Sequence, residues 1–408
     1  MPPSRGRAAV SLPVAGAPPP AFPYEFDPLT RAKARDYERG GRLLAVLGGT
    51  VLPAALALAF FATGASSRLA QWARSLAPAS PAAGDAAYIA VFALGFALST
   101  LPVAYYLGHV RERRFGLTER RAAAFLKDAA KGAAVATALA LGLLLPFFYV
   151  TRRFDDWWVV ATALYGGYLV VSAAVLPHLV LPLFYKVEPL PAGALRDAIV
   201  GAAAAAGLRP GTRIVVLQES AKSRRANAFV HGFGRTRRIV LYDTLVRSFH
   251  PREVAFTVAH EAGHIATRDV PKSAALSLAV VAPELFLLSV FLEALAPLGG
   301  ARGATDVAVV PLLLAFVVGF GLATRPAFAA LHRRSERRAD AFALRATGDG
   351  AAAASMLRRV CDLNLMDDAP PRLVERLLHT HPSPERRIRD ALAHGSASLA
   401  APEGRAAG

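Results

Sequence analysis

Cysteine is almost absent from this chain of 408 residues, which contains one, Cys361. A disulfide framework and a multi-cysteine metal site are therefore excluded, and Cys361 is expected to be a small buried apolar residue. Charge is also scarce, because Asp, Glu, Lys and Arg make up 19% of the residues and hydrophobic residues 54%. That content, with a mean hydropathy of +0.36, excludes an intrinsically disordered protein.

The few charges are mostly positive, and the formal net charge is +17. A nucleic-acid-binding protein is disfavoured, because its basic face would have to coexist with long uncharged runs. Six apolar runs approach the length of about 20 residues that a membrane-spanning helix needs. They cover residues 43–63, 86–107, 132–150, 157–184, 273–298 and 307–324.

The segments between these runs alternately hold 42 and 5 of the 47 Lys and Arg residues. Because basic loops remain on the cytoplasmic side, this asymmetry predicts an integral membrane protein with both termini cytoplasmic. The Ala- and Arg-rich composition indicates a bacterial chain, and hence the bacterial plasma membrane. The fifth run contains Glu284 and Glu293, which are either a proton or ligand site or carboxyl groups partnered within the helix bundle.

The longest internal basic segment, residues 186–272, has the pattern of a folded cytoplasmic insert. Residues 192–206 predict a helix, and residues 212–218 and 237–243 predict two short strands joined by a polar connection. Pro251 then begins a helical stretch, since proline is favoured at the first helical position.

That stretch contains the sequence HEAGH at residues 260–264. His260 and His264 share one helix face, so both imidazoles can bind one zinc ion, while Glu261 is placed to take a proton from water. Two ordinary helical histidines are the alternative interpretation.

Catalytic zinc usually has a third protein ligand. Residues 327–345 predict a helix in which Glu336 and Asp340 lie on one face. One carboxylate could complete the zinc site and the other could orient a ligand histidine from outside it. Alternatively, both are solvated acids that pair with four nearby arginines, namely Arg333, Arg334, Arg337 and Arg338.

With these motifs in order, the chain over about residues 25–393 resembles the type I CAAX prenyl endopeptidases, which are membrane-embedded zinc metalloproteases. The resemblance rests on NAFVHGFGRTRRIVLYDTLV (227–246), VAHEAGH (258–264), SERRADAFA (335–343) and HPSPERRI (381–388), with FGLTERRAAAFLKDAAKG (115–132) and PLFYKVEPLP (182–191) in support. It implies one zinc ion per chain with ligands His260, His264 and Glu336, and Glu261 as the base. It also implies supporting roles for Asp340, Asn227 and His381.

Two of these residues have local reasons for a role. His381 precedes Pro382, which favours an extended loop from which the imidazole can point into a cleft. Asn227 precedes the predicted strand 237–243, whose edge could pair with an extended substrate. A turn-capping Asn and a surface His are the alternatives.

The expected fold class is mainly α, a polytopic helical membrane protein with about six spans and a cytoplasmic α+β metalloprotease domain. Its segments are a disordered N-terminal segment (1–25), four spans (26–185), the protease insert (186–272), two spans (273–324), the C-terminal protease part (325–394) and a disordered tail (395–408).

The favoured function is peptide-bond hydrolysis near the cytoplasmic membrane face, on a peptide or protein substrate that is membrane-associated or prenylated. A non-catalytic zinc-binding transporter or scaffold is the alternative, resting on Glu284 and Glu293. A lipid-binding module of the same fold would differ only in turnover.

Overall fold

The computed structural model describes residues 20–205, 207, 212–231 and 238–400, and divides the chain into two compact units. The helical unit comprises Arg39–Val171 and Pro271–Pro326. The site unit comprises the residues up to Glu38, Ser172–Val270 and those from Ala327 onward. Residues 1–19 and 401–408, for which disorder is expected from the sequence, lie outside the described residues.

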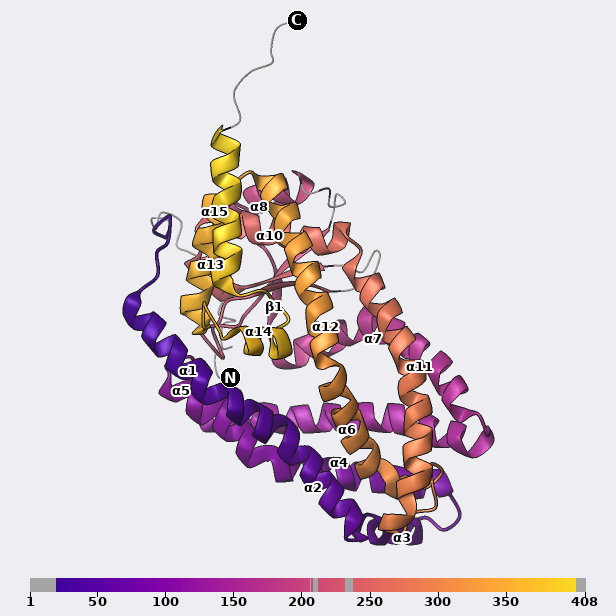
Figure 1. Cartoon of the computed structure of the whole chain (residues 1–408). Helices are drawn as coiled ribbons and strands as arrows, with labels where there is room; N and C mark the ends of the chain where they lie inside the picture. Colours follow the sequence, from indigo (N-terminus) through magenta and orange to yellow (C-terminus); the bar gives the residue numbers. More distant parts are fainter. Residues whose placement is uncertain (1–19, 206, 208–211, 232–237, 401–408) are drawn as a thin grey trace, which may run out of the picture. The chain divides into compact units, whose positions relative to one another are not determined.

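The helical unit is built from long apolar helices (Figure 1). Its elements are α2 (Leu52–Ala62), α3 (Ala65–Leu76), α4 (Pro81–Tyr105), α5 (Glu112–Arg114), α6 (Ala122–Arg153) and the larger parts of α7 (Trp157–Phe184) and α11 (Asp269–Leu295). Tyr88, Phe148 and Leu292 are buried in its apolar core. Leucines such as Leu98 and Leu143 are exposed on its surface, as expected for helices that face lipid.

Five described helical segments are long and apolar enough to cross a membrane, which are Pro28–Ala62, Pro81–Arg114, Ala122–Arg153, Asp269–Gly299 and Val307–Thr347. They cover five of the six predicted runs, apart from Thr63 at the end of the first run. The remaining run, residues 157–184, coincides with the single helix α7, which is not among the five.

The site unit has a four-stranded sheet in the order β1-β2-β4-β3. Strands β2 (Arg213–Leu217) and β4 (Arg238–Tyr242) are parallel, and β1 (Val187–Pro189) and β3 (Ala228–His231) pair antiparallel at the two edges. The prediction of β2 and β4 was correct, but β3 lies within the connection expected to be irregular. Consequently β4 is an inner strand, and the expectation of a free edge on it is wrong, since β3 occupies that edge.

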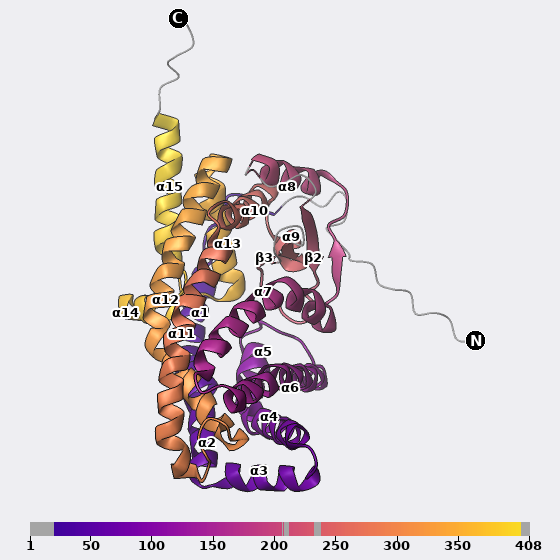
Figure 2. The same cartoon turned by 90° about the vertical axis from the view of Figure 1, so that its right-hand side faces the viewer.

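The site unit also contains helices α8 (Ala194–Ala205), α9 (Asp243–Ser248), α10 (Pro251–Ala266), α13 (Gly350–Asn364), α14 (Arg372–Leu378), α15 (Pro384–Ala400) and the part of α12 (Val310–Thr347) from Ala327 onward. Of these, α8, α9 and α10 lie next to the sheet, and the remaining helices lie beyond them on one side (Figure 2). Ile239, Phe256 and Leu357 belong to one buried core, and Cys361 is buried as expected.

Several observed boundaries lie at other residues than the expected ones, and two of these differences affect the ends of the site unit. The first part of α1 (Pro28–Val46) belongs to the site unit, because the Arg31 guanidinium pairs with Asp362 at 2.6 Å and anchors this segment to α13. Helix α15 continues to Ala400 and thus includes residues 395–400, which were expected to belong to the disordered tail.

Candidate metal centre

The N-terminal end of α10 holds the HEAGH helix firmly in the site unit. Pro251 occupies its first turn, and a capping box joins His250 and Glu253. The fully buried Glu253 carboxylate accepts hydrogen bonds from the His250 N–H at 2.7 Å, the Arg359 guanidinium at 2.9 Å and the Ser355 hydroxyl. Because a buried carboxylate is stable only when its oxygens are satisfied, this network fixes α10 against α13.

A close helix contact brings α10 against α12. A Cβ built on Gly263 would lie 2.9 Å from the Cα of Ala339 and 3.1 Å from its carbonyl oxygen. Any side chain at residue 263 would therefore push the helices apart, so glycine permits the approach on which the next contacts depend.

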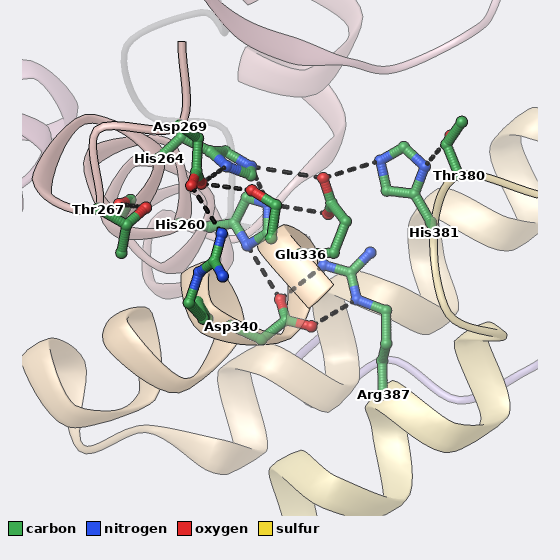
Figure 3. Close-up of polar contacts among 12 residues, drawn as sticks. His260, His264, Thr267, Asp269, Glu336, Asp340, Thr380, His381 and Arg387 are labelled. Carbon is green, nitrogen blue, oxygen red and sulfur yellow. Dashed lines mark hydrogen bonds and ion pairs between the residues drawn. The ribbon is translucent and has the colours of Figure 1, made fainter. Parts of the chain in front are cut away.

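Figure 3 shows His260 and His264 directed at Glu336 across this contact. The two Nε2 atoms are 3.2 Å apart, His260 Nε2 lies 3.4 Å from Glu336 Oε2, and His264 Nε2 lies 3.4 Å from Glu336 Oε1. Ligands 2.0–2.1 Å from a tetrahedral zinc ion are separated by about 3.3–3.4 Å. The three side chains, whose ligand atoms lie within 4.8 Å of one another, thus have the spacing that a small tetrahedral cation requires.

The other imidazole nitrogens face two aspartates. His260 Nδ1 lies 2.9 Å from Asp340 Oδ1, and His264 Nδ1 lies 2.9 Å from Asp269 Oδ2. A carboxylate at Nδ1 favours the tautomer with its proton there, which leaves the Nε2 lone pair for a metal. With this tautomer, two lone pairs and the Glu336 carboxylate converge without a donor among them, so the donor set fits a bound cation.

Each aspartate is itself held. Asp340 accepts two hydrogen bonds from the Arg387 guanidinium at 2.8 and 2.7 Å. Asp269 accepts hydrogen bonds from Arg338 at 3.0 Å and from the Ser335 hydroxyl, both on α12. Asp269 thereby connects the end of the HEAGH helix to the helix that carries Glu336.

Two functional candidates, Asp269 and Arg387, were missed in the sequence. Asp269 follows His264 by five residues, a spacing outside the HExxH pattern. Arg387 lies within HPSPERRI, but the sequence alone does not distinguish it from Arg386.

The carboxylates of the cluster stabilise positive charge, either on a protonated histidine or on a bound cation. Burial alone would lower the pKa of His260, but the Asp340 and Glu336 carboxylates outweigh this effect and raise that pKa to about 10. A metal ion that binds His260 must therefore displace a proton. Burial likewise opposes the charge on Arg387, yet the adjacent Asp340 raises its pKa above the usual value.

Glu261 does not belong to the group of ligand atoms. Burial raises the pKa of its carboxyl group, while the two histidines and a hydrogen bond from the Val230 N–H partly oppose this shift. Strand β3 therefore lies next to Glu261, with Val230 in contact with the carboxylate. A carboxylate with a raised pKa, beside a metal site, suits a general base.

Of the three residues with expected supporting roles, Asp340 and His381 contact the cluster. The Nε2 of His381 lies 3.4 Å from Glu336 Oε1, its Nδ1 interacts with Thr380, and its side chain is 57% exposed. Asn227 is exposed at the start of β3, where its Oδ1 accepts the Ala228 N–H and its carbonyl accepts the Tyr242 N–H.

The carboxylates that supported the transporter interpretation lie in the helical unit. Glu293 Oε1 accepts the Ala304 N–H at 3.4 Å, and its carboxylate occupies the space beside Gly303, where a Cβ would approach within 3.0 Å. Glu293 thus has a structural partner within its bundle, in agreement with the second interpretation above.

Comparisons with known proteins agree with this geometry. Residues 189–394 match the family model for peptidase family M48, and residues 12–186 match that for the CAAX prenyl protease N-terminal region with five membrane helices. The chain is similar to the uncharacterized metalloprotease YhfN of Bacillus subtilis (strain 168), at 25% identity over 334 residues, 81% of this chain and 78% of the relative.

The chain is also similar to CAAX prenyl protease 1 of Saccharomyces cerevisiae, at 29% identity over 258 residues, 60% of this chain and 56% of the relative. Among solved structures, the crystal structure of S. mikatae Ste24p has the same fold, with a TM-score of 0.77, 23% identity and coverage of 90% of this chain and 89% of that one. The first family match covers about half of the chain and includes the whole metal cluster. The chain therefore belongs to peptidase family M48 and is an integral-membrane metalloendopeptidase.

Proposed function

We propose that the metal is zinc, bound by His260, His264 and Glu336, and that Glu261 is the general base. One observation carries this proposal, namely the separations of 3.2 and 3.4 Å among the two Nε2 atoms and the Glu336 oxygens. Asp340 and Asp269 act through the ligands, by holding each imidazole in the tautomer that presents Nε2.

A zinc ion at this site supplies Lewis acidity, which lowers the pKa of water and polarises a peptide carbonyl. The Glu261 carboxylate takes a proton from the attacking water and delivers it to the leaving amine. Burial of Glu261 supports this role, because it raises the pKa of the carboxyl group above its usual value.

His381 donates a hydrogen bond from Nε2 to the oxygen that becomes negative during attack. Its position beside Glu336, in the connection between α14 and α15, supports this assignment. Asn227 acts from the start of β3, where an extended substrate backbone adds to the free edge of the sheet next to Glu261.

The substrate is a peptide segment of a membrane-associated or prenylated protein, cleaved at the cytoplasmic face of a bacterial plasma membrane. The 42-to-5 distribution of Lys and Arg supports this orientation. The names of the yeast and B. subtilis relatives support proteolysis.

Metal analysis of the purified chain tests the ligand assignment. The parent protein is expected to hold about one zinc ion, and His264→Ala and Glu336→Ala are each expected to lose it. The Leu373→Ala control removes an exposed side chain of the site unit and is expected to leave zinc content unchanged. Parental zinc content in both ligand variants would contradict the proposal.

A further inference from the structure

Away from the metal centre, the site unit contains a polar cavity of about 410 Å³, whose lining residues include none of the proposed metal ligands. Helices α12, α14 and α15 form its walls, and Figures 1 and 2 both show α14 beside α12. Besides Ala330 and Glu375, it is lined by Arg333, Arg334, Arg337, Arg372, Arg376 and Arg386.

One carboxylate therefore faces six guanidinium groups, and that carboxylate is already engaged. Glu375 is buried, pairs with Arg386 at 3.4 Å and accepts the Ser383 N–H at 3.3 Å. Arg333 donates hydrogen bonds to the backbone carbonyls of Glu375 and His379 at 3.0 and 2.7 Å. These contacts build a rigid base for the cavity but leave it strongly positive.

The other four arginines, Arg334, Arg337, Arg372 and Arg376, form no hydrogen bond or ion pair with the described part of the chain. Two of them, Arg337 and Arg376, act electrostatically on Arg333, as does Arg386. Like charges held around one cavity repel, and an anion that enters it relieves this repulsion.

We propose that this cavity binds a phosphate group, that of an anionic phospholipid headgroup. Guanidinium groups bind phosphate through paired N–H donors, and several arginines converging on one cavity match a multiply charged oxyanion. Arg333 follows Thr324, the last residue of the apolar run, by nine residues in the same helix. Basic clusters directly after a membrane span are typical of sites for anionic lipid headgroups. A soluble phosphate shares this chemistry.

The test uses the full chain purified in detergent, with three probes: phosphatidylglycerol, phosphatidylcholine and inorganic pyrophosphate. Bound lipid is counted by native mass spectrometry, and pyrophosphate binding is measured by calorimetry. The cavity variant carries Gln at Arg334, Arg337, Arg372 and Arg376. The matched control carries Gln at four exposed arginines without an ion pair in the described chain, which are Arg196, Arg213, Arg224 and Arg389.

The parent and the control are expected to bind phosphatidylglycerol in preference to phosphatidylcholine. In the cavity variant, the ratio of bound phosphatidylglycerol to bound phosphatidylcholine is expected to be at least about tenfold lower. Pyrophosphate binding that depends on the same four arginines, without a lipid preference, would support the phosphate site and assign it a soluble ligand. If the parent, the control and the cavity variant bind phosphatidylglycerol equally and also bind pyrophosphate equally, the proposal is overturned.

Thermal stability provides a second measurement, made on the parent and on the cavity variant. Inorganic pyrophosphate is expected to raise the Tm of the parent protein above its value in sodium chloride of equal ionic strength. In the absence of phosphate, the cavity variant is expected to be at least as stable as the parent, because repulsion is removed. A Tm that phosphate leaves unchanged would argue against the site.

Discussion

Gly263→Ala is the substitution for which the structure predicts the most direct effect on the metal centre. The added Cβ would lie 2.9 Å from the Cα of Ala339 and 3.1 Å from its oxygen. Non-bonded carbon atoms pack at about 3.5–4.0 Å, so α12 would have to withdraw from α10 by about 0.6–1.1 Å. Overpacking of this kind typically costs about 1–3 kcal/mol of unfolding free energy.

The metal should respond more strongly than the fold. Ala339 lies between Glu336 and Asp340 on α12, so the withdrawal moves the proposed ligand and the carboxylate proposed to support it together. The distance of 3.4 Å between Glu336 Oε1 and His264 Nε2 would lengthen by a similar amount. Two ligand atoms so far apart could not both lie about 2 Å from one tetrahedral zinc ion. Zinc affinity is therefore expected to fall at least about tenfold.

The assay is zinc competition against a chromogenic chelator, together with the Tm of the metal-free protein. Gly201→Ala on α8 is the matched control, because nothing lies within 4 Å of its Cβ. That control should be neutral or stabilising by about 0.5–1 kcal/mol. Parental zinc affinity in Gly263→Ala would refute the reasoning, as would an equal loss in Gly201→Ala.

Three further predictions follow from the same contacts. Asp269→Asn and Asp340→Asn should each weaken zinc binding by about 10–100-fold in the same competition assay, and parental affinity would show that the aspartates do not position the imidazoles. His381→Ala should keep the zinc and the Tm but lower peptide turnover by at least about tenfold, whereas a parental rate would make it a surface residue. Reporter fusions in loops 64–85 and 299–306 should be extracytoplasmic and a fusion near residue 225 cytoplasmic, and an outside signal at residue 225 would reverse the orientation.

Much of the candidate metal centre could be predicted from the sequence, because its proposed ligands lie in regular helices. A spacing of four residues puts His260 and His264 on one face, and the same spacing relates Glu336 to Asp340. Helix periodicity alone makes these pairs neighbours. It does not bring the two helices together, and that contact depends on Gly263, whose role became visible only when Ala339 was located.

The residues that were missed depend on tertiary contacts. Strand β3 is four residues long in a polar connection, so local propensity was too weak to predict it, and pairing with β4 stabilises it. Asp269 lies after the end of α10, where helix periodicity no longer predicts direction. The six arginines that line the cavity between α12, α14 and α15 come from three helices, and the sequence shows them only as scattered positive charge.

The central claim, that this chain hydrolyses peptides with Glu261 as the base beside a His260–His264–Glu336 zinc site, is tested most directly by Glu261→Gln. Glutamine keeps the size of the side chain but cannot take a proton from water, and residue 261 contributes no ligand. The variant is therefore expected to retain about one zinc ion per chain and to lose peptide cleavage by about 10²–10⁴-fold. Cleavage at the parental rate, or loss of zinc as complete as in His264→Ala, would contradict the account.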